Sequence, residues 1–293
     1  MANEEIKSTL DGRGDKKPTA KNRLDLLFPF GLAGGFAALL GAAMVDNTSP
    51  IAFLNLAALI IVVGGAVSAS MVQHPWPIAK RALLIIKWGF YPPHYDPAEF
   101  IDEIIDWAKK AKTGGLLSMD ALIEGVEDPF MRKGLQMAVD GIESVVILKT
   151  LRLRLHTQTE VDMMAASLYE AAGGYAPTFG IMGAVTGLIE VMHHLNDPST
   201  LGTGIAAAFV STIYGLVLAN VICIPTANRL RGVIAEQLVA RNVFLDGLAG
   251  ILRGTNTMEL REVLESYYLP KTRTPPLHDA EKPASPADMS NAA

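Results

Sequence analysis

The sequence predicts an all-α integral membrane protein that crosses the bilayer four times. Both termini are expected in the cytoplasm, with a large helical cytoplasmic loop between spans 2 and 3. Two observations lead to this fold class. Half of the 293 residues are hydrophobic and only 19% are charged. In addition, all 25 Lys and Arg residues lie outside 24–79 and 155–228. A soluble core does not require such gaps, whereas membrane proteins keep Lys and Arg in their cytoplasmic segments.

Four stretches without a charged residue are each long enough to cross a bilayer, which takes about 20 apolar residues. The turns at 46–50 and 190–200 contain no Lys or Arg, so we expect both hairpins to point away from the cytoplasm. The first 25 residues are polar and are not typical of a cleaved signal peptide. The four expected spans are Leu26–Val45, Ile51–Val72, Ala171–Ile189 and Ile205–Ile224.

The loop at 73–170 is too long to lack structure of its own. Asp96-Pro97 and Asp128-Pro129 each combine an N-cap residue with proline at the first helical position. A helix is therefore expected to begin at each of these pairs. Gly114-Gly115 should end the first of the two helices.

Further helices follow from the same reasoning. Ser118 is expected to cap a short helix through Glu124, and residues 142–175 predict one long helix that continues into span 3. Two more helices are expected at 229–252 and 259–268. The predicted organisation is an N-terminal tail (1–25), a transmembrane hairpin (26–72), a cytoplasmic helical domain (73–170), spans 3 and 4 (171–228), C-terminal helices (229–270) and a disordered tail (271–293).

The composition excludes several classes of function. A net charge of −5 argues against nucleic-acid binding, and a single cysteine, Cys223, excludes an internal disulfide. A membrane enzyme is the alternative from a different class. However, no metal-ligand cluster, nucleophile–base spacing or glycine-rich phosphate loop stands out. We therefore expect no enzymatic activity, no cofactor and no bound metal.

No acidic residue lies inside any expected span. Ion paths through membranes usually use an ionisable group. If this protein moves ions, the carboxylate must therefore come from a partner chain. A hydroxyl in a membrane helix more commonly bonds to its own i−4 carbonyl, which is the simpler interpretation for Ser211 and Thr212. The weak polar candidates are Thr186, Ser211, Thr212, Tyr214 and Asn220.

Small residues recur every four positions in spans 3 and 4, and such stripes let helices approach closely. The sequence leaves open whether they pack within one subunit or between subunits. Pro177 and Pro225 lie near the cytoplasmic ends of the same spans, where each is a static kink or a hinge. The stripes are Ala176, Gly180 and Ala184 in span 3, and Ala207, Ser211, Gly215 and Ala219 in span 4.

Several long motifs occur in order along the chain. They are Ile61–Gly65, Asp128–Leu135, Val139–Gly141, Gly173–Gly180, Asn196–Gly202, Tyr214-Gly215 and Leu218–Asn220. Through these motifs, residues 26–270 resemble the flagellar motor stator subunit family, MotA and PomA.

The resemblance implies a multi-pass protein of the cell inner membrane that forms a homopentamer. It also implies a single-span partner of the MotB/PomB type, which supplies the membrane aspartate and anchors to peptidoglycan. Ion flow would turn the pentamer and drive the rotor protein FliG. This partner agrees with the carboxylate missing from the spans.

The resemblance also suggests roles for individual residues. Pro177 and Pro225 match the family's two prolines, which favours the hinge interpretation, and Thr212 matches the hydroxyl that faces the partner's aspartate. Rotor-facing charges would lie around Lys112 and Asp120, where the family often has Arg in place of the lysine. Their expected neighbours are Lys109, Glu124 and Glu127. A solvated helix face is the simpler interpretation of this charge run.

The coupling ion is the open point. Sodium-driven relatives tend to have Thr where this chain has Ala184, and Asp where it has Asn55. Both differences remove oxygen ligands or charge that a hard cation prefers, so protons are favoured over sodium. Thr186 lies two positions from Ala184 and weakens that preference. The expected ion-path residues are Thr212, Ala184, Thr186, Tyr214 and Asn55. A TolQ/ExbB-type energiser is the other alternative, although such proteins usually have three spans and an external N-terminus.

Overall fold

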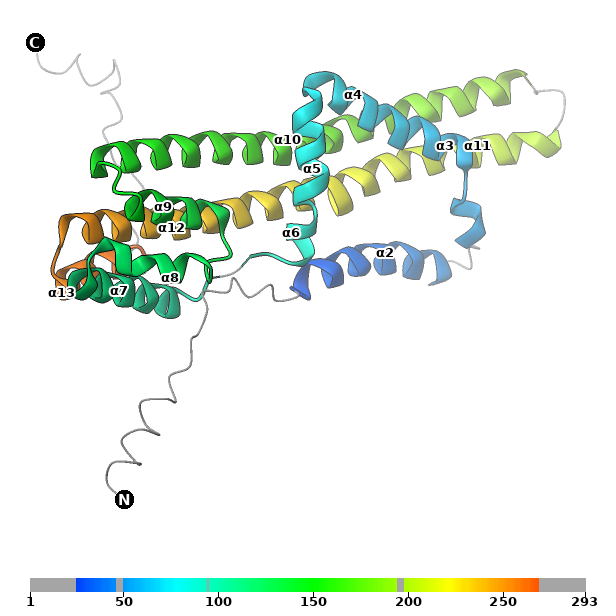
Figure 1. The fold of residues 1–293 in the computed structure, drawn as a ribbon. Coiled ribbons are helices and arrows are strands. Elements are labelled where there is room, and N and C mark those ends of the chain that lie inside the picture. Colours follow the sequence, from blue (N-terminus) through cyan, green and yellow to red (C-terminus); the bar gives the residue numbers. More distant parts are fainter. Residues whose placement is uncertain (1–24, 46–49, 94, 194–197, 269–293) are drawn as a thin grey trace, which may run out of the picture.

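Two very long helices form the spine of the protein (Figure 1), in a computed structural model that describes residues 25–45, 50–93, 95–193 and 198–268. Helix α10 (Ser144–His193) runs for 50 residues. Beside it, α11 (Pro198–Val217), the π-helical turn η4 (Leu218–Cys223) and α12 (Ile224–Arg253) follow one another directly. A helix of 50 residues is about 75 Å long, whereas a bilayer core is about 30 Å thick. Both rods therefore extend well beyond a membrane, and the expected fusion of 142–175 with span 3 is confirmed.

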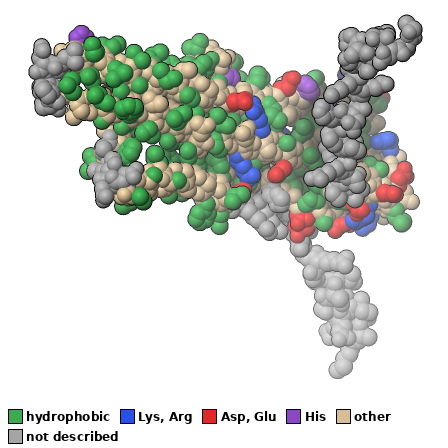
Figure 2. All heavy atoms as spheres, turned by 180° about the vertical axis from the view of Figure 1, so that it is seen from behind, with side chains coloured by type: hydrophobic (Ala, Val, Ile, Leu, Met, Phe, Trp, Pro, Cys, Tyr) green, Lys and Arg blue, Asp and Glu red, His purple; other side chains and the backbone are tan. Residues whose placement is uncertain are grey.

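Within the described residues, four helices are long and apolar enough to cross a membrane, as expected. Figure 2 shows hydrophobic side chains over the half of the molecule that holds these helices, and charged side chains gathered on the rest. The described residues contain no β-strand, which confirms the all-α class. The four helices are Leu27–Val45, Leu56–Gln73, Ser144–His193 and Leu201–Arg253.

Span 2 begins later than the sequence predicts. Residues Pro50–Phe53 form a separate 3₁₀ turn, η1, and the helix starts at Leu56. The reason is Asn55, whose extended backbone (φ −131°, ψ 109°) and side-chain oxygen cap the helix by accepting the N–H of Ala58 at 2.9 Å. Span 2 then consists of α3 (Leu56–Leu59), a π-helical turn η2 (Ile60–Gly64) and α4 (Gly65–Gln73).

Span 1, α2 (Leu27–Val45), lies at the edge of the molecule. Only 6% of its most apolar 18-residue stretch is buried inside the protein. The chain just before it is tied to the rest by the Asp25 N–H, which donates to the carbonyl of Phe90 at 3.1 Å. The rings of Phe28 and Phe90 also meet edge to face at 5.1 Å. These two contacts anchor the start of the helix at Phe90.

Two short helices, α5 (Trp76–Ile85) and α6 (Lys87–Phe90), run across the long rods between the spans and the charged end (Figure 1). Proline at the second position of α5 suits a helix start, since the missing N–H there has no partner in the helix. One face of α5 packs on both rods through a small buried cluster. That cluster is formed by Ile78, Ala82, Ile85, Ala165, Ala166, Leu230 and Ile234.

At the far end, four helices surround the ends of α10 and α12, and we call this assembly the head (Figure 1). The buried Phe244 of α12 lies in its core, with the rings of Trp107 and Phe130 at 6.3 and 6.1 Å. The four helices are α7 (Pro97–Gly114), α8 (Asp120–Ile123), α9 (Pro129–Val139) and α13 (Thr257–Glu265).

The predicted caps of α7 and α9 are confirmed. The Asp96 carboxylate accepts two backbone N–H groups of α7, and that of Asp128 accepts the N–H of Phe130 at 2.7 Å. Gly115 ends α7 with φ +73°, a conformation that favours glycine.

The prediction for Ser118 is wrong. Its hydroxyl donates backwards to the carbonyls of Lys110 and Gly115, so it closes the turn after α7 instead of capping α8. A 3₁₀ turn, η3 (Leu116–Met119), precedes α8. The disordered tail predicted at 271–293 falls outside the described residues, as does the N-terminal tail at 1–25 apart from Asp25.

Candidate functional site

The small-residue stripes of α10 and α11 face each other within one chain. A Cβ added to Gly180 would lie 3.1 Å from the carbonyl oxygen of Ser211, and one added to Gly187 would lie 3.2 Å from the backbone nitrogen of Ala208. On the other helix, a Cβ at Gly215 would lie 2.6 Å from the carbonyl oxygen of Ala176. The two backbones are therefore nearly in contact, and we call this region the seam. The small residues at these positions therefore pack within one subunit, which is one of the two possibilities that the sequence left open.

The two neighbouring hydroxyls in the seam behave differently. The Thr212 hydroxyl donates to the carbonyl of Ala208 at 3.5 Å, which is the expected i−4 bond. The Ser211 hydroxyl is buried and has no hydrogen-bond partner among the residues that the structure describes, so the i−4 interpretation fails there. Its oxygen would lie only 2.0 Å from a Cβ at Gly183, so it fills the space that a side chain at 183 would need.

Ala184 and Thr186 point in different directions from α10. Ala184 is half-buried and lies on the side of the helix that carries Gly180 and Gly187. Thr186 is exposed, and its hydroxyl donates to the carbonyl of Met182 at 2.9 Å. The threonine two positions away therefore does not replace a hydroxyl at 184.

Asn55 and Tyr214, expected separately as ion-path residues, meet at the start of span 2. The Asn55 N–H donates to the Tyr214 hydroxyl at 3.2 Å, and that hydroxyl in turn donates to the carbonyl of Phe53. The side-chain oxygen of Asn55 is already used in the helix cap. These two residues therefore join span 2 to span 4, a link that no local pattern reveals because 159 positions separate them.

The two prolines have different surroundings. Pro177 lies inside α10 without interrupting it, and its Cα would be 3.2 Å from a Cβ at Gly215. Pro225 is exposed and is the second residue of α12, directly after the π-helical turn η4. A proline removes one backbone hydrogen bond, and a π turn is a second irregularity beside it. Hinge motion at either proline stays a prediction.

Three ion pairs, which we call the collar, tie the chain together between the spans and the head. Arg81 of α5 binds the buried Asp162 of α10, with 2.5 Å between Nε and Oδ1. The other two pairs are Arg229–Asp25 and Arg231–Glu170. The sequence analysis missed all three, since pairing between positions 61 to 204 residues apart leaves no local signal.

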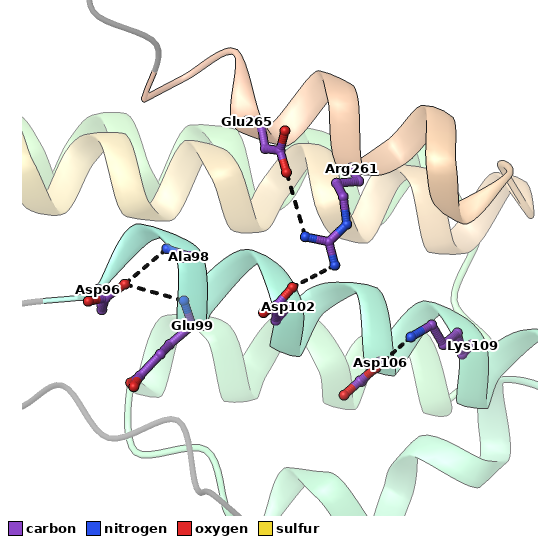
Figure 3. A network of polar contacts seen from close by, with 8 residues as sticks. All are labelled: Asp96, Ala98, Glu99, Asp102, Asp106, Lys109, Arg261 and Glu265. Atoms are coloured by element: carbon purple, nitrogen blue, oxygen red, sulfur yellow. Dashed lines mark hydrogen bonds and ion pairs between the residues drawn. The ribbon is translucent and has the colours of Figure 1, made fainter.

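All five residues expected to face the rotor are exposed and lie on the head. Lys112 is in the last turn of α7, and Asp120 is the first residue of α8. Lys109 pairs with Asp106 one turn earlier, with 2.9 Å between Nζ and Oδ1 (Figure 3). Glu124 follows α8 directly and Glu127 lies in the loop before α9.

The surface that carries these charges is held by ion pairs. Arg261 of α13 binds Asp102 of α7 at 2.5 Å and Glu265 at 3.5 Å (Figure 3). Elsewhere in the head, the carboxylate of Asp128 accepts the Tyr95 hydroxyl at 3.1 Å and lies 3.4 Å from Nε of Arg241. Burial and this carboxylate raise the pKa of Tyr95 well above its usual value of 10. The charged face of α7 is therefore fixed on a well-packed support.

These features define a four-span helical membrane protein whose paired helices extend from a glycine seam into a large head. Residues 122–266 match the MotA/TolQ/ExbB proton channel family. Over 244 residues the chain is 31% identical to Motility protein A of Bacillus subtilis. The matched region covers 83% of this chain and 90% of that protein. The chain therefore belongs to the MotA/TolQ/ExbB proton channel family, among its motility protein A members.

Solved structures agree over nearly their whole length. The flagellar MotAB stator complex from Bacillus subtilis matches with a TM-score of 0.74 and 32% identity, covering 83% of this chain and 95% of that one. The structure of C. jejuni MotAB matches with a TM-score of 0.76 over 86% of this chain and 98% of that one. Its 23% identity makes this second match evidence for the fold alone.

Proposed function

We propose that this chain is the stator subunit of a bacterial flagellar motor, which converts ion flow through the membrane into torque on a rotor. The observation that carries the proposal is the match to a MotAB stator structure at 32% identity over 95% of that chain. The protein would work with a single-span partner of the MotB/PomB type, as a pentamer in the inner membrane. FliG is the expected rotor protein.

The arrangement of the residues explains how such a machine would work. The spans expected from the sequence contain no carboxylate, so the partner's aspartate would carry the ion past the seam, where Thr212 offers a hydroxyl. A change in the packing of α11 against α10 would then move the ends of both rods that lie in the head, because α10 and the α11–α12 rod continue into it. The exposed charges at Lys112 and Asp120 would transmit this motion to the rotor.

We propose that the head is cytoplasmic and that both termini lie on the same side. The turns at 46–50 and 190–200 contain no Lys or Arg, which supports this orientation. In a Cys223→Ser background, a cysteine at Met192, near the outer end of α10, should react with an impermeant maleimide in intact cells. A cysteine at Lys149 should react only after permeabilisation, and the opposite pattern would invert the topology.

Protons are the proposed coupling ion. Ala184 offers no oxygen to a sodium ion, the hydroxyl of Thr186 is used on another face of α10, and the amide oxygen of Asn55 caps a helix. Rotation speed should therefore be unaffected by external sodium at a fixed proton-motive force. A speed that follows the sodium concentration would establish the sodium-driven alternative.

The function itself is tested by expression with the partner subunit in a bacterium that lacks its own stators. Swimming and rotation of tethered cells should be restored, and a variant of the partner without its membrane aspartate should restore neither. Failure to support rotation although the complex forms in the membrane would favour the TolQ/ExbB-type alternative. Catalytic turnover without ion conductance would instead support a membrane enzyme.

A further inference from the structure

The outward face of the crosswise helices α5 and α6 combines large apolar side chains with lysines. Ile78, Ala82 and Ile85 point into the protein, and the opposite side of the helix is exposed. The exposed fractions of its apolar residues are 59% for Trp76, 71% for Leu83 and 58% for Leu84. We call the outward set Trp76, Lys80, Leu83, Leu84 and Lys87 the α5 face.

The cations of this region fall into two groups. The three arginines of the collar are each paired with a carboxylate of the protein. Lys80 and Lys87, in contrast, form no ion pair within the described part of the chain. The ammonium of Lys80 lies 5.6 Å from the centre of the Trp76 ring, alongside the apolar residues. Two free positive charges therefore accompany an uncovered apolar surface.

The place of α5 in the fold indicates what covers this surface. Span 2 ends at Gln73, and α5 starts three residues later and turns across the spans (Figure 1). A helix that runs across the spans at the level where they end lies along the membrane surface. Apolar side chains with Trp and flanking lysines are the pattern of helices that rest in the headgroup layer.

We propose that the α5 face is a lipid-binding surface that embeds Trp76, Leu83 and Leu84 in one leaflet and recruits anionic phospholipid headgroups through Lys80 and Lys87. The chemistry recognised is a phosphate-bearing, negatively charged headgroup above an acyl chain. A row of anionic lipids at this level would hold the collar at a fixed depth. The proposal depends on neither the coupling ion nor the torque surface.

The test measures which lipid touches Trp76. The complex of this chain with its partner subunit is reconstituted in vesicles with equal mole fractions of phosphatidylcholine and phosphatidylglycerol, with bromine on the acyl chains of one lipid or the other. Bromine quenches indole fluorescence on contact. Subtracting the signal of a Trp76→Phe complex leaves the quenching that belongs to Trp76 alone.

Brominated phosphatidylglycerol should quench Trp76 more strongly than brominated phosphatidylcholine, with an enrichment of about fivefold for each lysine engaged. The double variant K80Q/K87Q should remove this difference. The matched control K133Q/K149Q, which loses two exposed lysines of the head, should retain it.

Equal quenching by both lipids in the unmodified complex would overturn the recruitment of anionic headgroups. Absence of quenching by either lipid would mean that a neighbouring copy or water covers the face, and would overturn the whole proposal. Both results would leave the proposed stator function untouched, because rotation of tethered cells is measured separately on the same variants.

Discussion

Gly215→Ala is expected to separate the two long helices at the middle of the seam. The added Cβ would lie 2.6 Å from the carbonyl oxygen of Ala176, 3.1 Å from the Cα of Gly180 and 3.2 Å from the Cα of Pro177. All three neighbours are backbone atoms, which cannot turn aside as a flexible side chain would. Ordinary contact of a Cβ begins near 3.4 Å, so α11 would have to move by about 0.8 Å.

The magnitude follows from this displacement. Overpacking a tight contact typically costs about 1–3 kcal/mol. For a chain of 293 residues, such a loss corresponds to a fall in Tm of about 2–5 °C. Because the seam also holds Thr212 beside the proposed ion path, the same substitution should reduce proton conductance and rotation speed.

The assay is thermal unfolding of the purified complex, with Gly232→Ala as the control. Gly232 lies on α12 of the same rod, and a Cβ there would meet nothing within 4 Å. Alanine is the better helix former by about 1 kcal/mol, so the control should be neutral or slightly stabilised. If Gly215→Ala unfolds at the same temperature as the control, the close approach of the helices at the seam is wrong.

Three further predictions concern the head and the collar. Reversing both charges at Lys112 and Asp120 should lower torque at high load in tethered cells while leaving the Tm unchanged, since both side chains are exposed; unchanged torque would remove them from the rotor surface. Arg81→Leu leaves the side chain of Asp162, which is only 3% exposed, without its cation. The free energy of unfolding should therefore fall by about 3–5 kcal/mol, as measured by thermal unfolding. A variant as stable as the parent would contradict the pairing. Burial raises the pKa of Glu103 from 4.5 to about 8. Between those values the folded state holds a proton that the unfolded state has released, so stability should fall as pH rises from about 4.5 to about 8. Unfolding curves measured across this pH range should lose part of that slope in Glu103→Gln, and an identical slope in both proteins would refute the shift.

The candidate sites were only partly predictable from the sequence. The sequence placed Lys112 in the last turn of a helix, because Gly114-Gly115 marks that end locally, whereas the next helix begins at Asp120 itself, without the expected cap from Ser118. That these charges face the rotor stays a prediction. The role of Ser118 was misjudged, since a hydroxyl can bond backwards to α7 as readily as forwards to α8. Nothing in the local pattern distinguished Ser211, without a partner, from Thr212, which bonds to Ala208.

The class of the protein follows from its residues alone: four apolar helices, a charged helical part and the family to which the motifs point. Hydropathy, capping and the placement of Lys and Arg are local or additive along the chain, so they can be read without coordinates. The partners that meet in the seam, the collar and the link between Asn55 and Tyr214 emerge only in the folded chain. Contacts between distant positions depend on how the helices cross, and neither propensity nor periodicity determines that geometry.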